Sequence, residues 1–186
     1  MNLNIFNHFP ELKLSDEILL RELKHTDANS LKNILSDPKV APFIPNDVIP
    51  QSITQALVEI NFLRSLFKNK KSVYWGINHA EHGLIGTVGY ENWQMYHNRL
   101  EVAFELNPIF WQRGIMSMCL RGIIEYAFEE MQVNRIEAYT LTTNEASHKT
   151  LLKVGFKEEG RLKKYRKFNG EFVDVIIFGL VNENTE

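Results

Sequence analysis

Apolar and polar residues follow two different periods in the middle of the chain. In the segment 100–106 every second residue is large and apolar, which is the period of a strand with one buried face. Glu101 and Glu105 then point to the opposite face. In the segment 115–131 apolar residues recur at spacings of three and four, and this period predicts an amphipathic helix. A strand leading directly into a helix is therefore expected here.

The same patterns predict further elements on both sides of this segment. Alternating or continuous apolar runs predict six more strands, and amphipathic stretches that follow capping residues predict three more helices. The strands are expected at 18–23, 73–78, 84–93, 135–141, 161–168 and 172–180, and the helices at about 27–35, 52–68 and 144–155. Thr26 or Asp27, Ser52 with Gln55, and Asn144 are the expected N-terminal caps. The dipeptide Asn169-Gly170 predicts a tight hairpin.

The order of these elements is β-α-α-β-β-β-α-β-α-β-β. We interpret it as an α/β fold of the mixed α+β kind: a single domain over residues 1–186, with a central twisted mixed sheet of about seven strands and helices on both faces. The passage from strand 100–106 to strand 135–141 through a helix predicts a right-handed parallel crossover. The turn after the first of these strands then lies where ligands of α/β sheets bind.

That turn has the properties of an anion site. The segment 107–117 opens the helix at 115–131, and the first main-chain N–H groups of a helix have no acceptor within it. The helix dipole adds partial positive charge at the same end, so a phosphate can bind without a lysine. Gly114 removes the Cβ that would hold an anion away from the main chain. A glycine at such a turn can also be purely structural.

Composition and charge narrow the functional classes. The chain has 186 residues, 44% of them apolar, and a net charge of −2, so it lacks the basic field that drives nucleic-acid binding. Cys119 is the single cysteine, which suits a reducing compartment. No apolar run approaches the roughly 20 residues of a membrane span, and the N-terminus does not read as a signal peptide. We expect a soluble cytoplasmic protein.

Other chemical signatures are weak. The six histidines have no ligand spacing beyond His79 and His82 in a turn, so no metal is expected. Cys119 falls on the apolar stripe of its helix and is expected in the core. The basic run 161–167 alternates around the predicted hairpin and is expected to be solvated; the alternative is that part of it faces an acidic acceptor or a phosphate.

Two stretches carry a resemblance to a known family. The first is Trp111-Gln112-Arg113-Gly114-Ile115-Met116-Ser117, and the second runs from Asn144-Glu145-Ala146-Ser147 through Lys153-Val154-Gly155-Phe156 to Glu159-Gly160. With the order of elements, they resemble the Gcn5-related N-acetyltransferase (GNAT) superfamily, in particular the ribosomal-protein N-acetyltransferases of the RimJ/RimL type. The family's loop is usually Gln/Arg-x-x-Gly-x-Gly/Ala. Here Trp111 and Met116 depart from it and only Gly114 matches strictly.

The resemblance implies acetyl-CoA as co-substrate, bound where strands 100–106 and 135–141 splay apart. The pantetheine would pair with the edge of the first strand, at Phe104, Glu105 and Leu106. The pyrophosphate would lie on main-chain N–H groups of the helix-opening loop, contributed by Gln112, Arg113, Gly114, Ile115, Met116 and Ser117. Asn144 would hydrogen-bond the pantetheine, a role that is compatible with capping its helix.

The implied reaction is direct attack of an amine on the thioester in a ternary complex, with no enzyme nucleophile. A carboxylate is the expected general base, and Glu101 and Glu105 are the candidates by position. Glu101 resembles the acidic residue common in this branch; the alternative is two solvated glutamates. The tyrosine that many members use to protonate the thiolate is replaced by Leu152, and Ser147 is the nearest substitute, unless it only contributes to the helix N-terminus.

Three functions remain open at this point. The resemblance favours the N-terminal amine of a protein, of the ribosomal type, as acceptor. The first alternative is a small amine, such as a polyamine, amino acid or aminoglycoside. The second is a catalytically silent protein that binds acyl-CoA. Neither nucleic acid nor a membrane is an expected partner. The oligomeric state is open, with a homodimer as one option.

Overall fold

The computed structural model describes residues 3–183, and in that range the strands form one eight-stranded sheet. Their order across the sheet is β1-β2-β3-β4-β5-β6-β8-β7. The strands are β1 (Leu12–Lys13), β2 (Ile18–Arg21), β3 (Tyr74–His79), β4 (Gly83–Gln94), β5 (Arg99–Leu106), β6 (Arg135–Leu141), β7 (Lys157–Phe168) and β8 (Glu171–Val181). The predicted mixed sheet is confirmed. The strand beyond the expected seven is β1, whose two residues are too few to leave an alternating pattern.

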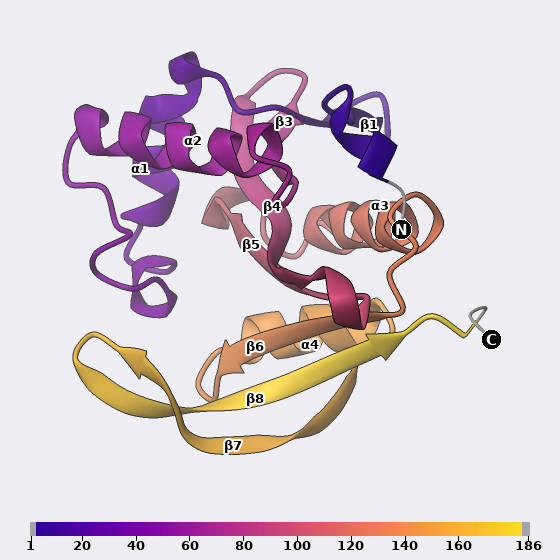
Figure 1. Cartoon of the computed structure of the whole chain (residues 1–186). Helices are drawn as coiled ribbons and strands as arrows, with labels where there is room; N and C mark the ends of the chain where they lie inside the picture. The colour runs from indigo at the N-terminus through magenta and orange to yellow at the C-terminus, as the bar shows by residue number, and fades with distance from the viewer. Residues whose placement is uncertain (1–2, 184–186) are drawn as a thin grey trace.

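Within residues 3–183, four α-helices lie on the two faces of this sheet, as predicted. They are α1 (Ala28–Leu35), α2 (Ile53–Lys68), α3 (Ile115–Glu129) and α4 (Glu145–Lys153). Short 3-10 helices are η1 (Leu3–Phe6), η2 (His25–Asp27), η3 (Ala41–Phe43), η4 (Met95–His97) and η5 (Pro108–Phe110). Figure 1 shows α1 and α2 over one face and α3 and α4 over the other.

The sheet separates two hydrophobic cores, and the period of two in the strands assigns side chains to each. On β3, Trp75 belongs to the larger core beneath α3 and α4, whereas its neighbour Tyr74 belongs to the smaller core beneath α1 and α2. On β5, Leu100 and Val102 enter the larger core, and Ala103 packs against the smaller one. Each face of the site described below therefore rests on its own packed layer.

Some of the predicted turns and helix caps are confirmed and others are not. Asn169 and Gly170 both have positive φ, at 49° and 92°, as the predicted hairpin between β7 and β8 requires. Ser52 Oγ accepts from the main-chain N–H of Gln55 at 3.2 Å, so half of the capping box forms. The Gln55 side chain accepts instead from the N–H of Gln51, at 2.6 Å. For α1 the expected cap is Thr26 or Asp27, and the second takes the position but not the capping bond.

Asp27 occupies the N-cap position of α1 without a side-chain capping bond. Its carboxylate is bound instead by the Arg21 guanidinium at 2.8 and 2.9 Å, and by the main-chain N–H of Lys24 at 2.7 Å. Both side chains of this ion pair are buried. Burying a charge without a partner costs more free energy than leaving a helix without a side-chain cap, so the carboxylate of Asp27 pairs with Arg21.

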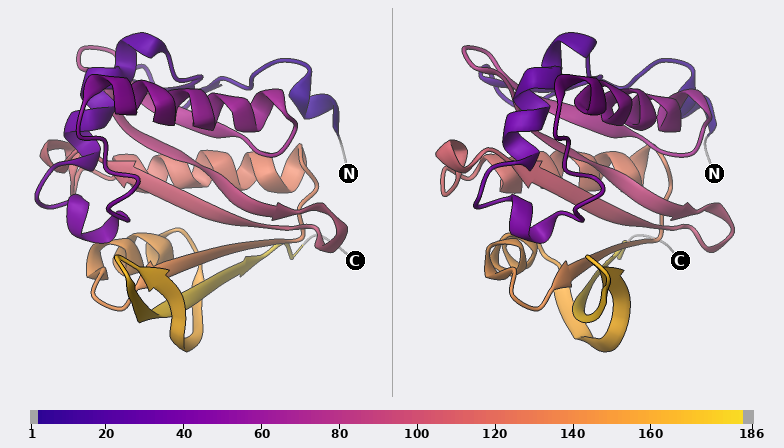
Figure 2. Two further views of the ribbon diagram at one scale, coloured as in Figure 1. Left: turned by 60° about the vertical axis from the view of Figure 1, so that its left-hand side comes forward. Right: turned by 90° about the vertical axis from the view of Figure 1, so that its left-hand side faces the viewer.

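The functional part of the fold is the seam between β5 and β6. These strands are parallel, and they pair at three positions only: Arg99 with Arg135, Leu100 with Ile136, and Glu101 with Glu137. Beyond this point β5 continues to pair with β4 as far as Leu106, and β6 with β8 as far as Leu141. The sheet therefore splits into two halves that diverge (Figure 2). We call the space between β5 and β6 beyond Glu101 and Glu137 the wedge.

Candidate active site

A cavity of about 1560 Å³ occupies the wedge. Its lining continues to α3 and α4 on one face of the sheet and to α1 and α2 on the other. Of the residues predicted from the sequence as site residues, these line it: Glu101, Phe104, Glu105, Leu106, Gln112, Gly114, Ile115, Met116, Ser117, Asn144 and Ser147. Arg113 is not in the lining; its guanidinium carbon lies 5.4 Å from the centroid of the Phe110 ring.

The loop before α3 is held by two side chains. The indole N–H of Trp111 donates to the carbonyl of Leu106 at 2.8 Å, and Asn107 Oδ1 accepts from the main-chain N–H of Ile109 at 3.1 Å. Gly114 is the N-cap of α3, has φ of 78°, and offers no side-chain cap. A Cβ there would meet nothing within 4 Å, so the left-handed conformation and not lack of space requires glycine. The first N–H groups of α3 thus have no capping side chain, and the residues that carry them, Ile115, Met116 and Ser117, line the cavity.

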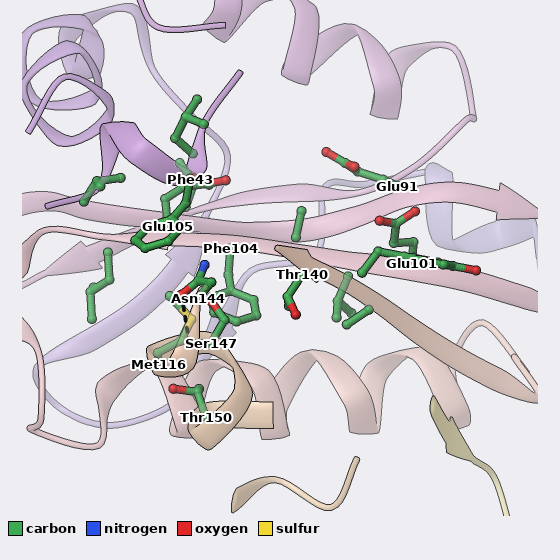
Figure 3. Close-up of a pocket in the computed structure, with 18 of the residues that line it drawn as sticks. Phe43, Glu91, Glu101, Phe104, Glu105, Met116, Thr140, Asn144, Ser147 and Thr150 are labelled. Atoms are coloured by element: carbon green, nitrogen blue, oxygen red, sulfur yellow. Dashed lines mark hydrogen bonds between the residues drawn. The ribbon is translucent and has the colours of Figure 1, made fainter. Parts of the chain in front are cut away.

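The N-terminus of α4 forms the opposite wall. Asn144 Oδ1 accepts from the main-chain N–H of Ser147 at 3.2 Å, so the predicted cap of this helix is confirmed. The capping bond uses Oδ1, which leaves the amide NH₂ as the group that can donate to a ligand. Figure 3 shows Asn144, Ser147 and Met116 together at one end of the cavity.

Glu105 lies in the same region but on the face covered by α1 and α2. Thr87 Oγ1 donates to its carboxylate at 2.6 Å, and the hydroxyl of Tyr74 lies 3.5 Å from the same oxygen. Burial raises the pKa of Glu105 to about 7; the hydrogen bonds from Thr87 and Tyr74 oppose this, and the charges of Glu91 and Glu59 add to it. The carboxyl group can therefore exchange a proton near neutral pH.

Glu101 has a different environment at the apex of the wedge. It is 6% exposed, and its two oxygens accept from Arg166 at 3.0 Å and from the Asn92 amide at 2.8 Å. The guanidinium carbon of Arg166, on β7, lies 5.9 Å from the centroid of the Tyr139 ring. The expectation that the basic run is solvated is therefore wrong for Arg166, which folds inward to neutralise Glu101.

Several lining residues were missed by the sequence analysis. Tyr74 and Thr87 reach Glu105 through the pairing of β3, β4 and β5, and Thr140 enters the wedge from β6. None of these three residues stands in a motif, and only the register of the strands brings them to the site. Phe43, one of the aromatic residues that the sequence offers for an acceptor pocket, comes from the η3 segment and lies beside Glu105 (Figure 3).

The comparison with known families identifies the family of this chain. The model of the acetyltransferase (GNAT) domain matches residues 17–157. The chain belongs to the GNAT acetyltransferase family. The uncharacterized N-acetyltransferase YoaA of Bacillus subtilis (strain 168) is 32% identical over 174 residues, covering 93% of this chain and 97% of YoaA. This GNAT acetyltransferase is an acetyl-CoA-dependent N-acetyltransferase, as the resemblance implied.

The solved structures that are similar to this GNAT acetyltransferase include ribosomal-protein acetyltransferases. The ribosomal-protein-S5-alanine acetyltransferase of Vibrio fischeri superposes with a TM-score of 0.80 at 26% identity, covering 95% of this chain and 99% of that one. RimJ of Mycobacterium smegmatis, in complex with CoA-disulfide, shares the fold with a TM-score of 0.78 at 22% identity, covering 89% and 82%. The resemblance to the RimJ/RimL type is confirmed.

Two further observations concern residues 3–183 of this GNAT acetyltransferase. No helix in that range is long and apolar enough to cross a membrane, and no group of three or more His, Cys, Asp or Glu residues there could hold a metal ion. Cys119 is buried in the core beneath α3, as predicted, and burial raises the pKa of its thiol to about 12. A thiol with that pKa stays protonated, so it is not a nucleophile.

Proposed function

We propose that this enzyme acetylates the N-terminal α-amine of a protein, of the ribosomal type, in the cytoplasm. The observation that carries the proposal is the wedge, with a cavity that opens on both faces of the sheet. A coenzyme can enter from the α3 and α4 face while an acceptor enters from the α1 and α2 face. The two substrates then meet between β5 and β6, as direct transfer in a ternary complex requires.

On the coenzyme side the chain supplies three kinds of contact. The main-chain N–H groups from Gln112 to Ser117 would hold the pyrophosphate, because Gly114 leaves the N-terminus of α3 uncapped. The wedge-facing edge of β5 pairs with no strand of the described chain from Val102 onward, so it is free to pair with pantetheine amides. The amide NH₂ of Asn144 would donate to the pantetheine from the other wall. The bound acetyl-CoA supplies the activated acyl group.

On the acceptor side we assign the general base to Glu105 in preference to Glu101. An incoming ammonium must lose a proton before it can attack, and a base works best when its pKa is close to the working pH. Glu105 meets this condition because burial raises its pKa to about 7. Both oxygens of Glu101 already accept hydrogen bonds, one from Arg166 and the other from Asn92. We retain Ser147 as the donor to the leaving sulfur.

The acceptor side of the cavity suits a cationic amine on an apolar segment. Its lining combines the carboxylates of Glu59, Glu91 and Glu105 with the aromatic rings of Phe43 and Phe62. The likeness to the S5-alanine acetyltransferase supports a protein N-terminus. The carboxylates also favour the second candidate, a small polycationic amine such as a polyamine, because each carboxylate can attract one ammonium group.

An acceptor screen with radiolabelled acetyl-CoA tests the proposal. The peptides begin with alanine or serine, and each has a matched control whose α-amine is blocked and which keeps an internal lysine. We expect label in the free peptides only. Label in polyamines, amino acids or aminoglycosides and in no peptide would establish the small-amine alternative. Tight coenzyme binding without transfer to any amine would establish a silent acyl-CoA-binding protein.

A further inference from the structure

Thr140 carries a polar group that the protein leaves unpaired. Among the described residues, its Oγ1 is the buried side-chain oxygen or nitrogen for which no hydrogen-bond partner is found. Comparable buried hydroxyl groups have partners: Ser72 Oγ donates to the carbonyl of Tyr90 at 2.6 Å, and Thr87 Oγ1 donates to Glu105. Buried polar groups are hydrogen-bonded in the great majority of cases, so this exception requires an explanation.

The position of Thr140 supplies one. It lies on β6 three residues beyond Glu137, the last residue that pairs with β5, and its main chain remains paired with Ile176 of β8. The alternation of β6 places its side chain on the same face as Ile136 and Ala138, toward α3 and α4. Thr140 lines the cavity while it is only 9% exposed.

Thr140 therefore lines the part of the wedge that a coenzyme would fill, with its Oγ1 buried in the wall. Figure 3 shows Thr140 between Ser147 and the apex residue Glu101. The loop at Gly114 and the cap at Asn144 both follow the ends of their strands, so they lie at the mouth of the wedge. A coenzyme held by its pyrophosphate at the mouth reaches Thr140 with its far end, which is the acyl thioester.

Valine would fill the same volume as threonine at this place without burying an unpaired hydroxyl. The cost of the hydroxyl is removed when a bound group supplies an oxygen or a nitrogen as partner. An ordered water could also satisfy Oγ1, provided that further polar groups hold it, but Ile136 and Ala138 on the same face are apolar.

We propose that Thr140 Oγ1 hydrogen-bonds the acyl end of the bound acyl-CoA and fixes the thioester in the wedge. The proposal rests on the proposed function, since it requires acetyl-CoA in the wedge. Thr140 is then a positioning contact for the acyl group, distinct from Ser147 at the sulfur and from Glu105 at the acceptor. It predicts a difference between acetyl-CoA and free CoA, which lacks the acyl group.

The test compares Thr140→Val, which removes the hydroxyl at constant volume, with Thr140→Ser, which keeps it. We expect Thr140→Val to weaken the affinity for acetyl-CoA by about fivefold to tenfold, the usual effect of one hydrogen bond, and the affinity for CoA by less than about twofold. Thr140→Ser should bind both within about twofold of the wild type. The unliganded Thr140→Val protein should melt at the wild-type temperature or above it, because it buries no unpaired hydroxyl.

Three results would overturn the proposal. Equal affinities of wild type and Thr140→Val for acetyl-CoA would mean that a water or no ligand pairs with the hydroxyl. An equal loss for CoA and acetyl-CoA would move the contact to the pantetheine. A lower melting temperature of the unliganded valine variant would make Thr140 a structural residue. Wild-type binding and turnover of acetyl-CoA test the proposed function separately, since they do not involve either variant.

Discussion

Replacing Glu105 by glutamine should make the protein more stable and the reaction slower, and both effects should grow as the pH rises. Burial raises the pKa of this carboxyl group from its ordinary value of 4.5 to about 7 in the folded protein. Below pH 4.5 the group is protonated in the folded and the unfolded states alike. Between pH 4.5 and 7 the unfolded chain releases a proton that the folded protein keeps, so the wild type loses stability as the pH rises.

The size of the stability effect follows from the shift. A rise from 4.5 to about 7 corresponds to about 3 kcal/mol of unfolding free energy when the group is fully ionised, and partial exposure of the side chain reduces this to between about 1 and 3 kcal/mol. Glutamine keeps the shape and can still accept from Thr87. Urea unfolding at pH 8 should therefore show Glu105→Gln as the more stable protein by that amount, with most of the difference gone at pH 5.

The kinetic effect has the opposite sign. A general base that is mostly protonated at pH 5.5 contributes little to the rate. The ratio of the wild-type kcat/KM to that of Glu105→Gln should therefore be close to its lowest value at this pH. The ratio should rise through pH 7 and level off near pH 8, at about 10² to 10⁴. The titration of the acceptor amine affects both enzymes equally and cancels in this ratio.

Glu101→Gln is the matched control, because it changes the same residue type on the same face of β5. It leaves the guanidinium of Arg166 without its carboxylate, so it should lower the stability at pH 8 by about 1–3 kcal/mol. Its rate ratio should not change with pH. The reasoning is refuted if Glu105→Gln neither gains stability at pH 8 nor shows a pH-dependent ratio. A pH-dependent ratio in Glu101→Gln would return the base role to Glu101.

Substitutions at three further residues test the coenzyme side. Gly114→Glu should abolish the rise in Tm that acetyl-CoA causes. Gly114→Ala introduces the same left-handed strain of about 1–2 kcal/mol but no charge, so it should keep part of that rise. Equal shifts of Tm in the two variants would remove the loop from the site. Asn144→Asp should keep the helix cap but raise the KM for acetyl-CoA several-fold. Asn144→Ala should raise the KM and also lower the free energy of unfolding by about 1 kcal/mol, because it removes the cap. An unchanged KM in both variants would limit Asn144 to capping. Ser147→Ala should lower the single-turnover rate by about tenfold without changing coenzyme affinity, and an unchanged rate would reduce Ser147 to a structural role.

The features that the sequence predicts well are those encoded locally. The period of two in β5, the period of 3.6 in α3 and Gly114 between them lie within about thirty consecutive residues, and each has a direct physical meaning. Asn144 could likewise be recognised as a cap from the helix that follows it. The predicted start of β7 is less accurate. The strand begins at Lys157 and not at 161, and the sequence does not reveal this because its first four residues are charged residues and a glycine without alternation.

The features that the sequence did not predict depend on register between distant strands. Thr87 stands directly opposite Glu105 in the β4–β5 pairing, and its hydroxyl donates a hydrogen bond to the carboxylate. Arg166 reaches Glu101 across 65 positions of sequence. No periodicity distinguishes these partners from other residues of their strands. The sequence therefore offers two glutamates of β5 as candidates for the proposed base, but it cannot choose between them, because their difference arises from their neighbours.

The opening of one seam accounts for both sides of the site. In the described chain, β5 and β6 form the parallel pair of an otherwise antiparallel sheet, and parallel pairing is slightly less stable per residue. Each of the two strands keeps a full-length antiparallel neighbour, β4 or β8, so the seam can open without unravelling either half. The opening leaves one edge of β5 without a partner strand, and the cavity that it forms is lined by Thr140 and Glu105. A ligand that fills the wedge replaces the missing strand contacts, which is why coenzyme binding and stability of this fold should be tightly linked.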